Sequence, residues 1–491
     1  MTYIFINPNQ SKGIINKNIY GQFAEHLGRC IYQGIYVGED SPIPNKNGLR
    51  LDVLNALKEL SIPLLRWPGG CFADTYHWKD GIGPKENRKS IINTNWGGVS
   101  EDNSFGTHEF MNLVNELGCE AYFSLNVGSG TVQEASDWIE YCNNNGISPM
   151  STLRKENGKE DPFNVKYWGI GNEAWGCGGN MHAEYYADIC RQYSTYMKDY
   201  NPDYKIFKIA SGANEDDYHW TKTILEKASD SIDAVSLHYY TLVHHDWKNK
   251  CFATNFSEEE YYCTLHHTLW MEELIENHGR IIKQYSKNHK IGLAVDEWGT
   301  WYNSEEGTNP NFLYQQNTMR DALVAAINLN IFNNHSDIVC MANIAQMVNV
   351  LQAMILTEGN KMVLTPTYHV FNMYKQHQRS KQIESYVETK NLNNDEQEVP
   401  NLHVSASSSN DEIFITVVNL NALESTPIDI MLNNIKFVSS EVLTGKIDAY
   451  NSFNNPNNVQ VKKLDSSFTS NNIHVILPPC SVSSFLVKVY E

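Results

Sequence analysis

Short apolar segments alternate with longer amphipathic segments along most of this chain, from about residue 19 to residue 376. The apolar segments have the length of strands, and they are Ile19–Ala24, Leu64–Trp67, Ala121–Asn126, Tyr167–Gly171, Lys205–Ala210, Ala234–His238, Ile291–Asp296 and Ile338–Ile344. The amphipathic segments have helical periodicity, and they are Leu51–Leu60, Phe110–Leu117, Glu134–Asn143, Ala183–Tyr200, Thr221–Ala228, Thr268–Ser286, Thr318–Leu329 and Tyr368–Gln376. Eight strands, each followed by a helix, predict an α/β fold, a closed parallel (β/α)8 TIM barrel. An open doubly wound sheet is the alternative, but no strand is followed by Gly-x-Gly-x-x-Gly.

The pattern changes at about residue 377, where helical periodicity gives way to short alternating runs separated by Asn, Ser, Pro and Gly. These runs are His403–Ala406, Ile413–Asn419, Ile428–Leu432, Val459–Leu464, Ile473–Leu477 and Ser484–Val489. Such spacing predicts an antiparallel β-sandwich. We therefore expect a catalytic barrel over residues 17–376 and a sandwich over residues 377–491. Residues 1–16 contain one more strand, Met1–Ile6, which we expect to join the sandwich.

Polar side chains stand where the predicted barrel strands end, and barrel enzymes carry their chemistry at that face. Seven of the eight strands end in this way, which is hard to explain without a shared site. The candidates, in chain order, are Glu25, His26, Arg66, Cys71, Asn126, Asn172, Glu173, His238, Tyr240, Glu297, Trp298 and Gln346. We expect Glu25, Arg66, Cys71, Asn126, Asn172, His238, Tyr240, Trp298 and Gln346 to bind substrate.

Glu173 and Glu297 are the candidates for catalysis, because cleavage of a glycosidic bond needs two carboxylates at one site. Arg66 and Tyr240 are the expected neighbours of Glu297, and they would keep it ionised as a nucleophile requires. Glu173 stands between Trp168 and Trp175 in the sequence, and an apolar setting would raise its pKa as a general acid requires. Asp296 competes for the role of nucleophile, but strand alternation is expected to point it to the other side.

The charge of the chain narrows the range of partners. Acidic residues outnumber basic ones by 57 to 38, which argues against nucleic acid and anionic membranes and is compatible with a neutral substrate. No Cys-x-x-Cys pair and no Cys/His cluster of metal spacing is present in the sequence, so we expect no metal and no cofactor in the chemistry.

The ten cysteines are dispersed, and in a chain of this length they are interpreted as buried, reduced thiols. The N-terminus shows neither a basic region nor a long apolar run, and no window approaches the roughly 20 apolar residues of a membrane span. These features predict a cytoplasmic protein.

Seven segments of the chain together resemble glycoside hydrolase family 51, the α-L-arabinofuranosidases. They are Tyr20–Gly28, Arg66–Gly70, Tyr76–Pro84, Gly169–Glu173, Ser236–Tyr240, Asp296–Trp298 and Ala342–Gln346. The resemblance covers nearly the whole chain, and the seven segments in this order are highly specific. Asn-Glu after a barrel strand is shared by a wide superfamily of retaining glycosidases and is less specific by itself.

The resemblance implies a retaining double displacement with Glu173 as acid/base and Glu297 as nucleophile. It also implies that Glu25, Asn172, Tyr240 and Gln346 bind the sugar, and it suggests a homo-oligomer, often a hexamer. One departure is Cys71, which stands where many relatives have Asn, and a thiol does not replace the hydrogen bonds of an amide.

The expected function is the exo-acting release of terminal α-L-arabinofuranosyl groups from arabinan, arabinoxylan or derived oligosaccharides. A barrel glycosidase of another specificity, such as a β-xylosidase or an endo-glucanase, is the first alternative. A non-catalytic carbohydrate-binding protein is the second, although binding alone does not require both glutamates.

Overall fold

The computed structural model describes residues 2–287, 289–394 and 397–490, so Met1 and Glu491, at the ends of two predicted segments, lie outside the described residues. The chain forms two compact units. One consists of Met1–Tyr20, Tyr240–Ile275 and Trp298–Glu491, and the other of Gly21–Tyr239 and Glu276–Glu297. The domain boundaries at residues 16 and 376 stay a prediction. None of the described helices is long and apolar enough to cross a membrane.

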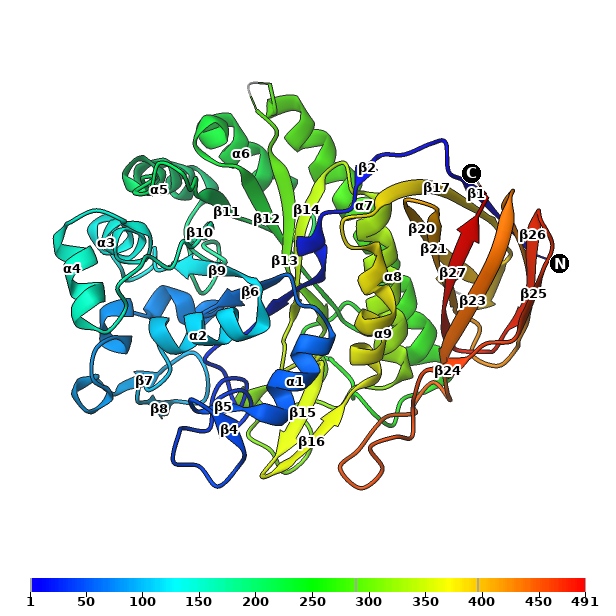
Figure 1. Ribbon diagram of the computed structural model, residues 1–491, viewed down its shortest axis with the longest axis horizontal. Helices are drawn as coiled ribbons and strands as arrows, with labels where there is room; N and C mark the ends of the chain where they lie inside the picture. The colour runs from blue at the N-terminus through cyan, green and yellow to red at the C-terminus, as the bar shows by residue number, and fades with distance from the viewer. Residues whose placement is uncertain (1, 288, 395–396, 491) are drawn as a thin grey trace. The chain divides into compact units, whose positions relative to one another are not determined.

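The predicted (β/α)8 barrel is confirmed, because eight strands close on themselves (Figure 1). Around the barrel they are β10 (Tyr167–Ile170), β11 (Phe207–Asn214), β12 (Ala234–Thr241), β13 (Gly292–Thr300), β14 (Val339–Ala345), β3 (Gly21–Phe23), β6 (Leu64–Trp67) and β9 (Glu120–Leu125). The strand pairings within the unit of Gly21–Tyr239 and Glu276–Glu297 are parallel, as between β10 and β9. The carboxyl ends of these strands therefore face the same way and carry the polar residues singled out above.

The helices follow the strands at the expected places, with α4 as an addition. They are α1 (Leu51–Glu59), α2 (Thr107–Leu117), α3 (Val132–Asn143), α4 (Pro149–Glu156), α5 (Ala183–Tyr196), α6 (Tyr218–Ala228), α7 (Glu258–Tyr285), α8 (Met319–Asn334) and α9 (Pro366–Tyr374). The start of α4 follows local rules, because Ser148 caps it and Pro149 occupies its first turn. Its short sequence has no long apolar stripe, which is why periodicity did not reveal it.

Short elements connect these strands and helices. The paired strands are β4 (Asn45–Lys46) with β5 (Leu49–Arg50), β7 (Ile91–Asn93) with β8 (Val99–Glu101), β15 (Ile355–Glu358) with β16 (Lys361–Leu364), and β18 (Asn391–Asn394) with β19 (Gln397–Pro400). The 3-10 helices are η1 (Lys17–Tyr20), η2 (Cys71–Thr75), η3 (Trp78–Gly81), η4 (Lys85–Asn87), η5 (Ser229–Ser231), η6 (Pro310–Phe312) and η7 (Lys375–His377). Among them η2 matters most for the site, because it follows β6 directly.

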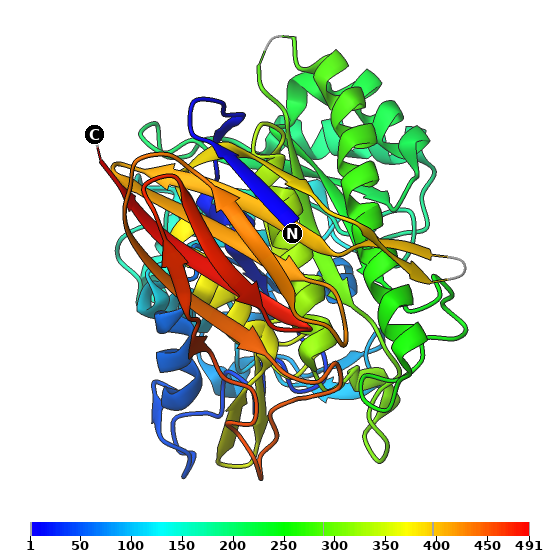
Figure 2. The same ribbon diagram turned by 90° about the vertical axis from the view of Figure 1, so that its right-hand side faces the viewer.

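The predicted C-terminal sheet domain is also confirmed, and Figure 2 shows its strands in yellow, orange and red with the dark-blue β1 among them. Its strands are β1 (Thr2–Asn7), β2 (Gly13–Ile14), β17 (Lys381–Glu388), β20 (Leu402–Ser409), β21 (Glu412–Asn419), β22 (Thr426–Met431), β23 (Ile435–Thr444), β24 (Lys462–Lys463), β25 (Ser466–Phe468), β26 (Asn472–Leu477) and β27 (Ser481–Val489). Strand β1 pairs antiparallel with β17 and parallel with β22. Buried residues from opposite halves of the sheet, such as Ile430 of β22 and Ile415 of β21, share one core, as the layers of a sandwich do.

Helix α8 shows how the unit that includes Trp298–Glu491 is packed. Its residues Met319–Asn333 are all buried, including Asn330 and Asn333. The helix packs against α9 and against β20, β21 and β27 of the sheet domain (Figure 1). Asn330 accepts a hydrogen bond from the Thr416 hydroxyl, and Asn333 accepts one from the Tyr20 hydroxyl. A helix that is covered on every side satisfies its buried amides in this way.

Candidate active site

Glu297 lies inside strand β13 and is paired with Arg66 of β6. The Arg66 Nη1 atom donates to Glu297 Oε1 at 2.8 Å and to the Asp296 carbonyl at 3.0 Å, while Nη2 donates to Asn172 Oδ1 at 2.5 Å. Burial alone would lower the pKa of Arg66, but Asp296 and Glu297 raise it above its usual value. One permanently charged guanidinium therefore ties the ends of three strands together. The predicted contact between Glu297 and Arg66 is confirmed.

Asp296 faces the same cluster as Glu297, so the expectation that it points away was wrong. Its Oδ2 accepts a hydrogen bond from the Tyr122 hydroxyl at 2.7 Å, and its Oδ1 lies 3.1 Å from His238 Nε2. Burial alone would raise the pKa of Asp296, but Arg66 and His238 hold it below its usual value. Asp296 is therefore ionised, and its contacts with Tyr122 and His238 make it a buried support of the site. Strand alternation misled the sequence interpretation because long neighbouring side chains reach both carboxylates.

His238, at the end of β12, links the three carboxylates. Its Nδ1 lies 2.9 Å from Glu173 Oε1 and 3.6 Å from Glu297 Oε2, and its Nε2 contacts Asp296. Burial disfavours the charged ring, but Glu297, Asp296 and Glu173 together raise the pKa of His238 to about 10. The imidazolium therefore stands between the carboxylates and donates from both nitrogens.

Glu173 lies in the loop after β10, and its side chain keeps 17% of its surface exposed. Its pKa is raised by burial and by the charge of Glu297, against the opposing effect of His238. The predicted direction of the shift is confirmed, and burial is its first cause, while the contribution of the neighbouring tryptophans stays a prediction. Trp168 is buried against Phe123 and Trp138, and the Trp175 indole donates to a backbone carbonyl.

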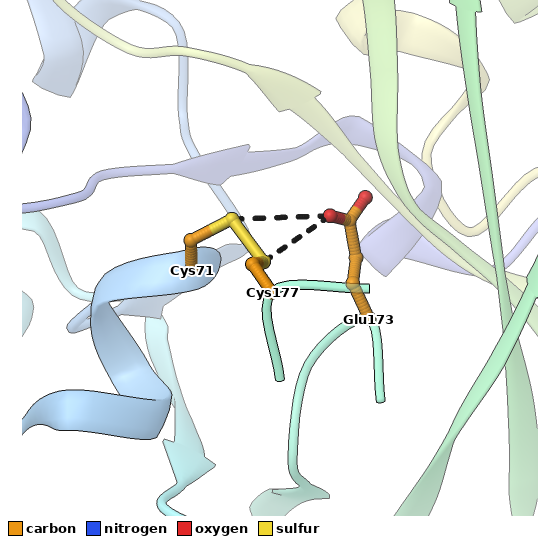
Figure 3. Close-up of side chains that lie close together, drawn as sticks. All are labelled: Cys71, Glu173 and Cys177. Atoms are coloured by element: carbon orange, nitrogen blue, oxygen red, sulfur yellow. Dashed lines mark hydrogen bonds between the residues drawn. A yellow bond between two sulfur atoms is a disulfide. The ribbon is translucent and has the colours of Figure 1, made fainter. Parts of the chain in front are cut away.

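A disulfide joins Cys71 of η2 to Cys177 of the loop that carries Glu173 (Figure 3). The two sulfur atoms lie 3.9 and 3.4 Å from Glu173 Oε2. This corrects the interpretation of all ten cysteines as reduced thiols; within the described residues the other eight carry thiols. In the sequence, Cys71 and Cys177 each follow the end of a barrel strand. That position alone does not predict that the two side chains bond to each other.

The distance between the two candidate catalytic carboxylates completes the geometry. An oxygen of Glu173, an oxygen of Glu297 and a nitrogen of His238 all lie within 4.8 Å of one another. One carboxylate is paired with a guanidinium, and the other has a raised pKa and retains access to solvent. A pair of carboxyl groups with these two environments is suited to acid–base and nucleophilic work on one bond.

Comparison with known proteins gives the family of this site. The family profile described as "Alpha-L-arabinofuranosidase 1 domain" matches residues 56–258, and the one described as "Alpha-L-arabinofuranosidase C-terminal domain" matches residues 296–481. An "Intracellular exo-alpha-L-arabinofuranosidase" from Bacteroides ovatus is 51% identical over 463 residues, which is 93% of this chain and 90% of the relative. The chain belongs to the α-L-arabinofuranosidase family.

Solved structures place the chain in glycoside hydrolase family 51. The crystal structure of a GH51 arabinofuranosidase from Xanthomonas axonopodis pv. citri matches with a TM-score of 0.97 and 44% identity over 99% of both chains. An α-L-arabinofuranosidase from Thermotoga maritima in complex with arabinose matches with a TM-score of 0.88 and 34% identity over the full length of both. The resemblance inferred from the seven sequence segments is confirmed.

Two further candidates of this family 51 chain lie at strand ends in the same unit. Glu25 is buried, and its Oε1 accepts hydrogen bonds from the Phe72 backbone and the Trp96 indole at 3.0 and 2.9 Å. A Cβ atom on Gly69 or Gly70 would lie 3.0 Å from a Glu25 oxygen, which explains the glycine pair. Asn126, in contrast, uses its amide to hold its own loop through Tyr76 and Ser129. Sequence reasoning missed Trp96, whose loop position gave no periodic signal.

Tyr240, Trp298 and Gln346 belong to the other compact unit, and their part in substrate binding stays a prediction. Trp298 is fully buried against Phe332, and Gln346 is buried directly after β14. Tyr240 packs edge to face on Trp301, with ring centroids 5.0 Å apart, and Trp247 packs on both. No pattern in the sequence marks Trp247 or Trp301, because both aromatic residues stand in loops.

Two clusters of the site bring possible metal ligands together. One is Cys71, Glu173 and Cys177, and the other is Glu173, His238 and Glu297. In the first cluster the two sulfurs are bonded to each other. In the second, the carboxylates are already engaged by His238 and Arg66. The expectation that no metal takes part in the chemistry stays a prediction.

Proposed function

We propose that this chain removes terminal, non-reducing α-L-arabinofuranosyl groups from arabinan, arabinoxylan or arabino-oligosaccharides, with retention of configuration. One observation supports the proposal above all: an oxygen of Glu173 and an oxygen of Glu297 lie within 4.8 Å of each other, and Glu297 is paired with Arg66 whereas Glu173 has a raised pKa. The relative from Bacteroides ovatus is named an exo-acting arabinofuranosidase, which supports the choice of sugar and of exo action.

In the first step Glu297 attacks the anomeric carbon, and the bond to the leaving oxygen breaks as Glu173 gives that oxygen its proton. The products are a glycosyl ester on Glu297 and the shortened saccharide. In the second step Glu173, now ionised, takes a proton from water, and the oxygen of that water displaces Glu297 from the anomeric carbon. Arabinofuranose leaves, and both glutamates return to their starting states.

The roles follow from the environments of the two residues. The Arg66 guanidinium donates to Glu297 at 2.8 Å and holds this carboxylate in place for attack on the anomeric carbon. The raised pKa of Glu173 favours a protonated acid at the start, and departure of the negative charge from Glu297 on ester formation removes one cause of that raised pKa. Glu173 is therefore a weaker acid before the first step than after it, as a residue that acts as acid and then as base requires.

The spacing supports retention over inversion. Carboxyl groups about 5–5.5 Å apart leave room for a sugar carbon only, whereas about 6.5–9.5 Å is needed to place a water molecule as well. A Glu173 oxygen and a Glu297 oxygen within 4.8 Å of each other are compatible with the shorter of these two separations.

The deciding experiment uses an aryl α-L-arabinofuranoside in aqueous methanol, with the methyl glycoside product identified by NMR. Retention yields the methyl α-L-arabinofuranoside, and the β anomer would overturn the mechanism. Aryl β-D-xyloside and cellulose substrates are assayed in parallel, because turnover of either in place of the arabinofuranoside would favour the β-xylosidase or endo-glucanase alternative. Absence of turnover with measurable sugar binding would favour a carbohydrate-binding protein. The control is Glu297→Gln, which keeps the shape of the side chain and removes its charge.

We also infer a homo-oligomer and a cytoplasmic location, in keeping with the family resemblance and the intracellular relative. Light scattering coupled to size-exclusion chromatography tests the first, with a monomer as the contrary result. Fractionation of cells that express the natural gene tests the second. The Cys71–Cys177 disulfide makes the second test informative, since a reducing compartment opposes such a bond.

A further inference from the structure

Helix η2 contacts the loop that carries Glu173 on both sides of that residue. On one side the Asn172 backbone donates a hydrogen bond to Asp74 Oδ2 at 3.0 Å. On the other side Cys71 is bonded to Cys177, with 5.5 Å between their Cα atoms. Asp74 and Cys71 both belong to η2, so a single short helix holds the residue before Glu173 and the fourth residue after it.

Glu173 has a backbone conformation that needs such support. Its φ of +42° lies in the left-handed region, which costs a residue with a side chain roughly 1–2 kcal/mol. The turn is closed from within by two hydrogen bonds, from the Gly176 and Gly178 backbones to the Glu173 carbonyl at 2.7 and 3.0 Å. From outside the loop it is held by Asp74, by the disulfide and by Ser211, whose hydroxyl accepts from the Ala174 backbone.

Asp74 is fixed in its own place by further hydrogen bonds. Its Oδ1 accepts from the Val127 and Gly128 backbones at 2.8 and 2.9 Å, so the carboxylate joins the loops after β9 and β10. Packing around it is close, because a Cβ atom on Gly178 would lie 2.8 Å from Asp74 Oδ2 and 1.8 Å from the Asn172 carbonyl. A small shift of η2 would therefore be passed on to the loop instead of being absorbed in open space.

The disulfide also touches the Glu173 carboxylate itself (Figure 3). Oε1 of Glu173 is bound by His238, and Oε2 faces Cys177 Sγ at 3.4 Å and Cys71 Sγ at 3.9 Å. A sulfur atom in a disulfide carries no hydrogen, so the bridge lies against Oε2 without donating to it. A thiol at the same place would have a proton to donate, and a donor favours the ionised carboxylate. The oxidation state of the pair thus bears on the proton affinity of Glu173 as well as on its position.

We propose that Asp74 and the Cys71–Cys177 disulfide are positioning residues for Glu173, and that reduction of the disulfide selectively weakens protonation of the leaving group. This rests on the proposed function, in which Glu173 is the acid/base. Reduction by a dithiol balances as follows: one thiolate attacks Cys177 Sγ, Cys71 leaves as a thiolate and takes up a proton, and the second thiol of the reagent releases Cys177 as the reagent closes to its cyclic disulfide. Cys177 is exposed, so the attacking thiolate has access to it.

The test compares two aryl α-L-arabinofuranosides on the full-length enzyme, one with a poor and one with a good leaving group. The oxidised enzyme is treated with dithiothreitol, and the state of Cys71 and Cys177 is verified by alkylation and peptide mass spectrometry. We expect kcat for the poor leaving group to fall about tenfold or more and kcat/KM for the good one to stay within about twofold, since misplacement of a catalytic group by an ångström costs up to about 10²-fold. Reoxidation restores the rate.

Four variants sharpen the test. The double variant Cys71→Ser with Cys177→Ser is expected to resemble the reduced enzyme and to ignore dithiothreitol. Cys119→Ser, a matched control in the same unit, keeps the wild-type response. Asp74→Asn places an amide NH2 against the Asn172 N–H and is expected to show the same leaving-group dependence. Ser129→Ala is its control, because Ser129 bonds to the Asp74 carbonyl and not to its carboxylate.

The outcomes separate this inference from the proposed function. If verified reduction leaves the rates on both substrates unchanged, or lowers both rates equally, the proposed positioning role of Asp74 and the disulfide is wrong. Persistent thiols on Cys71 and Cys177 under oxidising conditions would overturn it as well. If Glu173→Ala itself shows no leaving-group dependence, the assignment of Glu173 as acid/base fails instead.

Discussion

The end of β13 and the loop after β10 hold their glutamates in opposite ways. Glu297 lies within a strand, and its carboxylate is paired directly with a buried guanidinium. Glu173 lies beyond its strand in a left-handed turn, and its carboxylate is bound by an imidazolium and lies against a disulfide. The first arrangement holds the Glu297 carboxylate in one position, whereas the second allows Glu173 to gain and lose a proton. The difference fits a nucleophile on β13 and an acid/base on the loop.

The comparison is tested most strongly by Glu297→Ala. Without a nucleophile no glycosyl ester forms, so kcat is expected to fall by about 10⁴-fold or more on activated and natural substrates alike. Initial rates with both substrate classes measure this, and circular dichroism verifies that the variant is folded. A variant that keeps a percent or more of the activity would reverse the assignment.

Glu173→Ala should give a loss that depends on the substrate. Protonation of the leaving group contributes about 10²–10⁴-fold, so poor leaving groups are expected to suffer this loss while the first step with good ones is spared. Added azide should speed turnover of the glycosyl ester and give the retained glycosyl azide. Equal losses on both substrates, with no response to azide, would contradict the role.

Arg66→Lys probes the link between the two regions. Lysine cannot bond at once to Glu297, the Asp296 carbonyl and Asn172, so we expect kcat/KM to fall about 10²-fold and the free energy of unfolding to fall by about 3 kcal/mol. Urea denaturation and steady-state kinetics measure the two effects. Arg154→Lys is the matched control, because Arg154 is also buried but bonds to backbone carbonyls away from the site. A comparable loss of kcat/KM in both variants would argue against a specific role.

His238→Gln tests the charge between the carboxylates. The folded-state pKa of about 10 exceeds the ordinary histidine value of 6.5, so His238 contributes stability that is full below about pH 6.5 and is lost as the pH rises through about 10. Urea titrations between pH 6 and pH 10 should show this decline in the wild type and a flatter profile in the variant. His278→Gln serves as the contrast, because burial lowers the pKa of His278 and its contribution has the opposite sign. An unchanged slope in His238→Gln would show that the ring is neutral.

The smallest expected effects come from two tyrosines. The Tyr122 hydroxyl supports Asp296 beside Glu297, and the Tyr186 hydroxyl donates to Ile170 and accepts from Ser211 beside the Glu173 loop. Each change to Phe should lower the free energy of unfolding by about 1–3 kcal/mol. Tyr122→Phe is expected to slow both aryl substrates alike by less than about tenfold, and Tyr186→Phe mainly the one with the poor leaving group. If both variants lose rate on the two aryl substrates in the same proportion, the proposed difference between the end of β13 and the loop after β10 is wrong.

Local periodicity was enough to predict the barrel and many strands of the sheet domain, but not all of its elements. Strand β23 was missed because its burial does not alternate, and its pairing with β27 is interrupted by an irregularity between Ile435 and Phe437. Strand β17 was missed because polar residues dominate it. In the site, strand ends indicated Glu173, Glu297 and Arg66, whereas Trp96 stands in a loop that no periodicity describes.

The sequence by itself determined that two glutamates lie at one face of one barrel. The hydrophobic periodicity of neighbouring residues predicts the strands and helices, and parallel strands end at the same face. The tertiary structure alone decided which groups surround them. Asp296 turns toward His238, Cys71 bonds to Cys177, and the Glu173 carboxylate lies against both His238 and the disulfide. These contacts join residues far apart in the chain, and they depend on how strands are placed side by side and on side-chain rotamers. Neither is encoded in a local pattern.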